Sequence, residues 1–413
     1  MAHHDAREIV EVFRDHLARH DRPLCFLFGA GTSAAVNIAP PSKPGGAAPF
    51  KPLIPPVAPL TQSCKRAVEA LGKEYQAAWI EAELEAGATP ANIEQVLSLV
   101  RKKLEAAGPK DRLLGLTVEG LTKIETCIRE TIARIVNPDE HTIPARVPHD
   151  DFAAWARRTT RTQPIEIFTT NYDILIERAL EAAQLPLFDG FVGSYRPFFR
   201  PDLVERDEYL PPPSFVRLWK IHGSVNWSIR SGLGGYRVTR GEPSNSGEMI
   251  YPSHRKYDES RQQPYLALLT RLRTALDRDD ALLVTAGYSF SDQHINSIIF
   301  SALDNRPRAH AIALQFADSH PTDPLSKDAR GRRNLLVLAR NAATIGGTWG
   351  EWRLKEAVDE RTAPFMDLAF DSDAVPEPGV PPLTGRFRLG DFVWLSRFLA
   401  AMTSSGSLSE ATP

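Results

Sequence analysis

The spacing of hydrophobic residues predicts a protein in which buried strands alternate with amphipathic helices. Four runs rich in apolar residues are expected to be strands. The first and the fourth are expected to be buried, because their apolar residues are mostly consecutive. The four runs are Leu24–Phe28, Ile165–Phe168, Phe215–Ile221 and Ala281–Ala286, and a last strand is expected at His310–Phe316. Helical spacing precedes the first run and follows the second and the fourth. We therefore expect an α/β fold with a Rossmann-like parallel sheet.

Two segments interrupt this alternation. From residue 60 to about residue 137 the apolar residues repeat at helical spacing, and Thr89–Pro90 has the composition of a helix start. An α-helical insertion over about residues 60–140 is therefore predicted between early strands. The preceding segment, Ala39–Pro59, contains too many prolines for a helix or a central strand. It is interpreted either as a lid over a binding site or as a passive linker.

The pattern is weaker beyond residue 320. Asn334–Arg340 is expected to be helical, and a final helix is predicted over Asp391–Met402. We therefore divide the chain into a domain of residues 1–320, which holds the sheet and the helical insertion, and a small C-terminal element of residues 321–413. This second region is expected to serve in oligomerisation or in docking a partner.

Composition and charge narrow the classes of protein. The chain has 413 residues and a formal net charge of -2, so bulk attraction to nucleic acid or to an anionic membrane is not expected. No stretch has the length and apolar character of a signal peptide or a transmembrane helix, which predicts a cytoplasmic protein. The three cysteines are far apart, so neither a disulfide framework nor a zinc site is expected, and Cys25 is predicted to be a core residue.

Glycine-rich or polar segments follow four of the predicted strands. They are Gly29–Ser33, Thr169–Asp173, His222–Gly223 and Gly287–Asp292. The carboxyl ends of parallel strands gather at one edge of an open sheet, where ligands bind. The sequence therefore predicts that these four segments form a single site.

Each segment also has a structural interpretation, which the sequence leaves open. Gly29–Ser33 can be an ordinary strand–helix turn, and Asp173 can be a helix cap. Asn171 is not needed as a second cap, so its amide is available for a carboxamide or a water molecule. His222 is a candidate base because histidine has an unperturbed pKa near neutrality, although a lone histidine is more often structural. The short side chains of Gly287–Asp292 can cap a helix or bind ribose hydroxyls.

Taken in order, the four segments resemble the sirtuin-type NAD⁺-binding domain. The resemblance covers about residues 20–320 and is greatest to the bacterial sirtuin-like branch used in anti-phage defence. The chain length, the helical insertion and Leu389–Asp391 are similar to the subgroup encoded beside a HerA-type ATPase.

The resemblance implies a role for each position. Asn171 and His222 would be catalytic, with Asn171 orienting the nicotinamide ribose or the attacking water and His222 acting on a ribose hydroxyl or on water. Asp173 would bind the nicotinamide carboxamide. The other residues expected to contact NAD⁺ are Gly29, Ala30, Gly31, Thr32, Ser33, Thr170, Gly287, Tyr288, Ser289 and Asp292.

The activity implied is that of an NAD⁺ glycohydrolase, which releases nicotinamide and ADP-ribose without a metal. Cyclised ADP-ribose is an alternative product. The protein would act as an NAD⁺-depleting effector in anti-phage defence, as a large homo-oligomer with a hexameric HerA-type ATPase. It would make no direct membrane contact and would meet nucleic acid only through that partner.

Three departures from the deacylating sirtuins weaken the prediction of acyl-lysine binding. The chain cannot build a four-cysteine zinc module, it lacks an Ile-Pro-Asp-Phe-Arg motif after the glycine turn, and Thr170 stands where glutamine is expected. Two alternatives nevertheless remain beside NAD⁺ hydrolysis. One is NAD⁺-dependent protein deacylation, and the other is a non-catalytic NAD⁺-binding scaffold for the ATPase.

Overall fold

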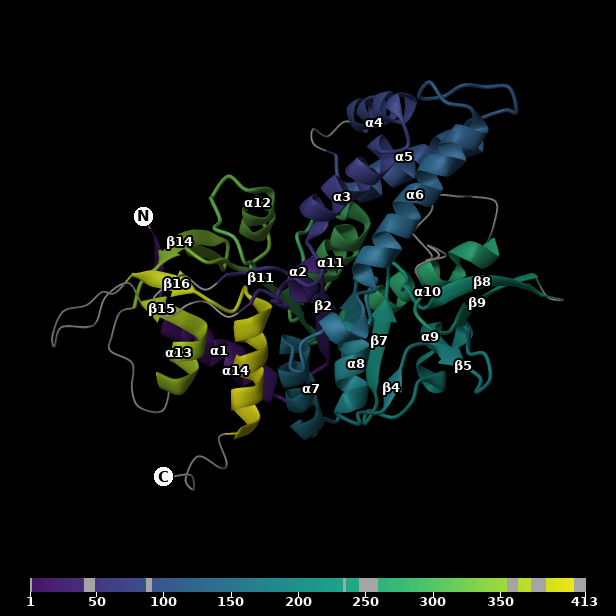
Figure 1. Cartoon of the computed structure of the whole chain (residues 1–413). Helices are drawn as coiled ribbons and strands as arrows, with labels where there is room; N and C mark the ends of the chain where they lie inside the picture. The colour runs from purple at the N-terminus through teal and green to yellow at the C-terminus, as the bar shows by residue number, and fades with distance from the viewer. Residues whose placement is uncertain are drawn as a thin grey trace.

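A ten-stranded, mostly parallel sheet forms the centre of the molecule (Figure 1). The computed structural model describes residues 2–40, 49–86, 91–232, 235–244, 259–354, 363–372 and 384–404. The sheet has the order β1-β14-β13-β12-β11-β10-β2-β3-β7-β4, and all neighbours from β12 to β4 are parallel. Its strands are β1 (His3–His4), β2 (Leu24–Phe28), β3 (Ile165–Thr169), β4 (Leu187–Phe188), β7 (Val216–Lys220), β10 (Leu282–Ala286), β11 (His310–Leu314), β12 (Leu335–Leu338), β13 (Ala342–Ile345) and β14 (Thr348–Trp352). The predicted α/β, Rossmann-like fold is confirmed.

Helices cover both faces of this sheet, because residues in its central strands are buried on both sides. In β2, Phe26 and Phe28 face one helical layer, whereas Cys25 and Leu27 face the other. The first layer contains α1 (Ala6–Ala18), α7 (Pro148–Arg158), α8 (Leu175–Ala182), α13 (Ala363–Ala369) and α14 (Phe392–Ser404). The second contains α10 (Glu259–Leu276) and α11 (Gln293–Asn305), and the four-stranded sheet of β5 (Phe191–Val192), β6 (Phe198–Phe199), β8 (Trp227–Gly232) and β9 (Gly235–Arg240) packs beside it. Other short elements are α2 (Ala30–Ala34), α9 (Asp202–Glu205), α12 (Pro324–Arg330), β15 (Phe370–Ser372) and β16 (Gly385–Phe387).

The predicted helical insertion is present and has a hydrophobic core of its own. It consists of α3 (Val57–Glu69), α4 (Lys73–Glu85), α5 (Ile93–Ala106) and α6 (Val118–Val136), and Figure 1 shows it rising from the sheet on the side away from α14. Its core includes Val36, Tyr172 and Val225, which follow β2, β3 and β7. The insertion therefore packs against the carboxyl ends of these strands.

Two helix boundaries differ from the expectation. α3 begins at Val57, so the end of the proline-rich segment Ala39–Pro59 is helical. Pro59 is tolerated there because the first turn of a helix leaves its N–H groups unbonded. The predicted start at Thr89–Pro90 lies outside the described residues, whereas α5 begins at Ile93, after the cap residue Asn92.

The C-terminal region contributes strands to the main sheet. The helix expected at Asn334–Arg340 is wrong, because Leu335–Leu338 forms β12 between β11 and β13. A short apolar run fits a buried strand as well as a helix, and here pairing with two neighbours decides for the strand. β11 is therefore not the last strand. The division predicted at residue 320 falls between two adjacent strands, and a separate role for the C-terminal region stays a prediction.

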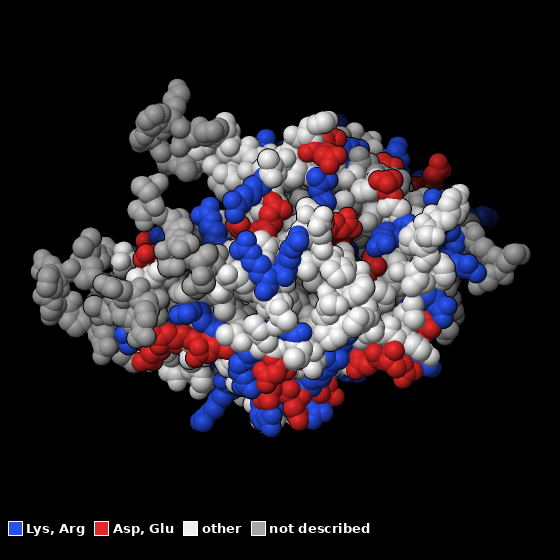
Figure 2. Space-filling view, turned by 90° about the horizontal axis from the view of Figure 1, so that it is seen from below, with Lys and Arg blue, Asp and Glu red and all other residues white. Residues whose placement is uncertain are grey.

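The surface carries charges of both signs (Figure 2), and the three cysteines are free thiols. None of the described helices is long and apolar enough to cross a lipid bilayer. Figure 2 shows Lys and Arg side chains interspersed with Asp and Glu on the face seen from below. The three cysteines are free thiols, of which Cys25 and Cys64 are buried and Cys127 on α6 is half-buried. The prediction that Cys25 is a core residue is confirmed.

Candidate active site

The four segments predicted to form one site meet at the carboxyl edge of β10, β2, β3 and β7. Two cavities, of about 440 Å³ and 890 Å³, open beside them. Both volumes are in the range of small-molecule binding sites. The residues shared by the two cavities are Ala30, Val57, Glu94, Thr170, His222 and Asp292. A ligand that occupied both cavities would therefore pass His222.

Three glycines bring two strand ends into direct backbone contact. Gly29 and Gly31 follow β2, and the Gly31 amide donates to the carbonyl oxygen of Gly287, at 3.0 Å. A Cβ atom added to Gly31 would lie 2.5 Å from the Cα of Gly287. Gly287 has a φ of +63°, which side chains rarely adopt. Only glycine fits at this contact, which forms one wall of the larger cavity.

Asn171 fixes the end of β3 to this glycine turn. The acceptors of its Nδ2 group are Gly29 O at 3.1 Å, Thr32 Oγ1 at 3.0 Å and Ser33 Oγ at 2.9 Å. Asn171 and Ser33 line the smaller cavity, whereas buried Thr32 lines neither cavity. The Nδ2 group of Asn171, expected to be available for a carboxamide or a water molecule, is instead occupied by acceptors of the protein itself.

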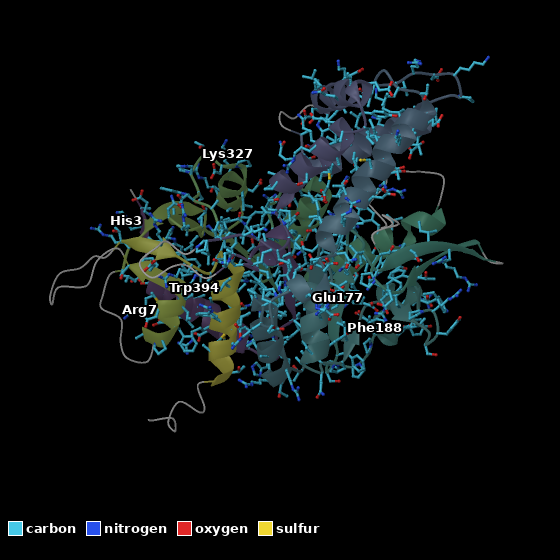
Figure 3. The ribbon with its side chains drawn as sticks, viewed as in Figure 1. His3, Arg7, Glu177, Phe188, Lys327 and Trp394 are labelled. Atoms are coloured by element: carbon cyan, nitrogen blue, oxygen red, sulfur yellow. The ribbon has the colours of Figure 1, made fainter. Side chains whose placement is uncertain are left out.

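Asp173 combines a structural position with a place in the cavity wall. Its Oδ2 accepts a hydrogen bond from Ser33 Oγ at 2.6 Å, and its Oδ1 accepts from the amide of Leu175 at 3.1 Å, in the first turn of α8. The carboxylate is 5% exposed and lines the smaller cavity. Lys220 donates to the Asp173 carbonyl and to Glu177, which Figure 3 labels on α8. The buried Lys220 thereby fixes the segment that carries Asp173.

His222 lies between two carboxylates supplied by different parts of the fold. Its Nε2 is 3.1 Å from Oδ2 of Asp292, and its Nδ1 is 3.4 Å from Oε1 of Glu94 on α5. The ring is only 4% exposed. Burial lowers the pKa of His222, but Asp292 and Glu94 outweigh burial and raise this pKa to about 9. A pKa of about 9 favours the imidazolium at neutral pH. Nε2 then donates a hydrogen bond to Asp292, whereas Nδ1 faces Glu94 as an ion pair without a hydrogen bond.

Asp292 caps a helix and contacts His222 at the same time. It is the N-cap residue of α11, and its Oδ1 accepts from the amides of His294, at 2.8 Å, and Ile295, at 3.1 Å. Burial raises the pKa of Asp292, but the contact with His222 contributes to a net lowering of this pKa. The cap interpretation of this position is correct, and Asp292 also contacts His222.

The rest of this segment lines the larger cavity. Tyr288 is buried and donates to Oδ1 of Asn296 at 3.0 Å, while the Ser289 and Ser291 hydroxyls pair at 2.9 Å. Within the described ranges, no group of three or more His, Cys, Asp or Glu side chains is arranged to hold a metal ion.

All the predicted site residues except Thr32 line at least one of the two cavities; Thr32 is buried and lines neither. The smaller cavity is lined by Ala30, Ser33, Thr170, Asn171, Asp173, His222 and Asp292. The larger cavity is lined by Gly29, Ala30, Gly31, Thr170, His222, Gly287, Tyr288, Ser289 and Asp292. Sequence reasoning missed Glu94, which lines both cavities. Its sequence signal is only that of an acidic residue in the first turn of a helix, which is common for structural reasons.

Part of the chain is similar to a known protein family. Residues 165–336 match the family model described as the SIR2-like domain. This match is less than half of the chain and runs from the start of β3 into β12, so it includes Asn171, His222 and Gly287 but not the glycine turn after β2. A search of curated proteins finds no match. The match supports a sirtuin-like family and fits an NAD-related activity.

Proposed function

We propose that the chain is an NAD⁺ glycohydrolase that releases nicotinamide and ADP-ribose. The observation that carries the proposal is the position of Asn171 and His222 at neighbouring strand ends, where both line the smaller cavity. The larger cavity adjoins it and is lined by Gly29 and Gly31. The SIR2-like match to residues 165–336 also supports it.

The chemistry of the bond fits the groups at this site. Nicotinamide leaves from NAD⁺ as a neutral molecule, so its departure needs no acid, and positive charge develops at C1′ of the ribose. Glu94 and Asp292 place two carboxylates around a single imidazolium, so the junction of the two cavities is net negative. Fixed negative charge beside C1′ would stabilise an oxocarbenium-like transition state.

The two cavities together suggest how NAD⁺ would lie. The pyrophosphate would pass the wall formed by Gly29, Gly31 and Gly287, where the backbone can approach closely. The nicotinamide ribose would lie at the junction beside His222, and the nicotinamide would enter the smaller cavity toward Asn171 and Asp173. The adenosine end would lie in the remainder of the larger cavity, with Thr170, Tyr288, Ser289 and Asp292 along the path.

The first test is cleavage of NAD⁺ by the whole chain, alone and with a HerA-type ATPase. We expect nicotinamide and ADP-ribose, separated by chromatography, from the wild type and loss of both products in Asn171→Ala and His222→Ala. Full activity in either variant would contradict the site. Tight NAD⁺ binding by calorimetry with no turnover, with or without the ATPase, would instead support the scaffold alternative.

Protein deacylation is a second candidate, which one feature of the smaller cavity favours. Ile93, Leu97 and Ile132 give this cavity an apolar wall that would accept an acyl chain. Nicotinamide release that depends on an acyl-lysine peptide would support deacylation, whereas release at the same rate without the peptide would support hydrolysis.

We further propose that the protein acts in the cytoplasm as an NAD⁺-depleting effector of anti-phage defence, as a homo-oligomer with a HerA-type ATPase. The support is the resemblance of the helical insertion and of Leu389–Asp391 to the subgroup with such a partner. An unregulated NAD⁺ hydrolase would harm its own cell, so the proposal includes control by assembly. Co-purification of the chain with the ATPase, compared with the chain alone by size-exclusion chromatography, tests this arrangement.

A further inference from the structure

Glu94 lies where the two cavities meet. It is in the first turn of α5, in the helical insertion, and it lines both cavities. Its Oε1 is 3.4 Å from Nδ1 of His222, and 48% of its side chain is exposed. A ligand that extends from the glycine turn to Asn171 has to pass this carboxylate.

The other carboxylates near the junction are occupied by the protein itself. Asp292 accepts two backbone hydrogen bonds at Oδ1 and contacts His222 through Oδ2. Asp173 accepts from Ser33 and from the amide of Leu175. Glu94 differs from Asp292 and Asp173, because its side chain is half exposed. Its contact to His222, at 3.4 Å, is also longer than the 3.1 Å contact of Asp292.

The charge on His222 bears on which group can take a proton. An imidazolium held between Asp292 and Glu94 has no free lone pair, so it cannot deprotonate a water molecule. A carboxylate with an accessible oxygen can do so. Among the described residues that line both cavities, Glu94 has this combination of charge and exposure.

We propose that Glu94 is the general base for the water that attacks C1′ of the nicotinamide ribose, an inference that rests on the proposed NAD⁺ hydrolysis. The C1′–N bond breaks, and its electron pair leaves with nicotinamide. The water oxygen forms a bond to C1′, and its proton passes to the Glu94 carboxylate and then to solvent. His222 stays protonated and orients Glu94, while Asp292 fixes the ring from its other side.

The test uses an anionic nucleophile, azide, which attacks without losing a proton. Glu94→Ala is expected to reduce kcat for nicotinamide release by roughly 10²- to 10⁴-fold with little change in KM. Azide is expected to restore nicotinamide release in this variant and to yield ADP-ribosyl azide, detected by mass spectrometry. Glu94→Asp, which keeps a carboxylate, is expected to retain part of the activity without azide.

Glu119→Ala is the matched control, because Glu119 is an exposed acidic residue in the first turn of α6. It should keep wild-type turnover and the same thermal midpoint as Glu94→Ala. Wild-type activity in Glu94→Ala, or a loss of activity that azide does not restore, would overturn the role of Glu94 as the base but leave the proposed hydrolase function standing. Azide rescue of His222→Ala in place of Glu94→Ala would move the base to His222. No nicotinamide release from the wild type would overturn the hydrolase function, and this inference with it.

Discussion

The two carboxylates beside His222 differ in how many protein contacts fix them. Asp292 is tied to the backbone of α11 by two hydrogen bonds, whereas Glu94 reaches the ring from the helical insertion and is half exposed. The strand-end position of His222 could be predicted from the residues around it. Its charge could not, because the raised pKa depends on Asp292 and on Glu94 together, and Glu94 is 128 positions earlier in the chain and carries no motif.

The charge on His222 predicts a pH dependence of stability. Its pKa of about 9 is above the ordinary value of 6.5, so the stabilisation is complete below pH 6.5 and is lost as the pH rises through 9. A shift of this size corresponds to about 3 kcal/mol. Urea unfolding of the wild type should show a fall in the free energy of unfolding over this window, and His222→Gln should not.

Two other histidines, of which His149 is buried and His16 is half-buried, act in a different pH range and serve as an internal comparison. Burial lowers the pKa of His149 and of His16 to about 4. Both histidines therefore reduce the free energy of unfolding as the pH falls from 6.5 to 4. An NMR titration that placed the midpoint of His222 near 6.5 would contradict the ion-paired arrangement.

At the scale of elements, the strands and the site segments were predictable to different degrees. β2 and β10 were predictable because mostly consecutive apolar residues mark strands buried on both faces, and β3 and β7 were predictable from shorter apolar runs that include Glu166, Arg217 and Lys220. β12 was not, since a four-residue apolar run becomes a strand only through its partners. The contribution of α5 was also not predictable, because it depends on how the insertion docks over the strand ends.

The start of α5 is the element on which Glu94 depends. Asn92 and Gln95 form a capping box there, and the amide of Ile93 donates to Thr61 Oγ1 of α3 at 2.9 Å. Asn92→Ala is expected to cost about 1 kcal/mol of stability and to lower nicotinamide release, because the first turn that positions Glu94 loosens and because Asn92 itself lines the larger cavity.

Thr117→Ala is the control for this prediction. Thr117 caps α6 by accepting from the amide of Gly120, so its loss should cost a similar amount of stability. Turnover should nevertheless stay at the wild-type level, since Thr117 lines neither cavity. Equal loss of turnover in both variants would indicate a general effect of stability rather than of Glu94 placement.

At the scale of the whole molecule, the sheet joins distant parts of the chain. β1 pairs with β14, and β12 pairs with β11 across residue 320. The C-terminal helix α14 packs against α7, with the Phe392 ring 5.2 Å from that of Phe28 in β2, and Figure 1 shows α14 and α7 side by side. Figure 3 labels Trp394 on the same helix, and Arg388 stacks on its ring at 4.5 Å.

A chain that ends at residue 320 is therefore expected to lose its cooperative fold. Its β11 edge and the faces of α1 and α7 would be uncovered, and they include buried residues such as Phe13 and Phe152. Differential scanning calorimetry and size-exclusion chromatography would show aggregation or no folding transition. A sharp transition and a monodisperse peak for residues 1–320 would instead support the boundary predicted from the sequence.

The uneven burial of the three thiols provides an optical probe of the helical insertion. Cys25 and Cys64 are buried, so a maleimide dye should leave them unmodified in the folded protein, whereas burial raises the pKa of all three thiols. Cys127 is the partly accessible thiol, and it lies on α6, in the same helical core as the α5 helix that carries Glu94. A single fluorophore on the unaltered chain would thus follow the environment of the insertion while a nucleotide or a partner is added.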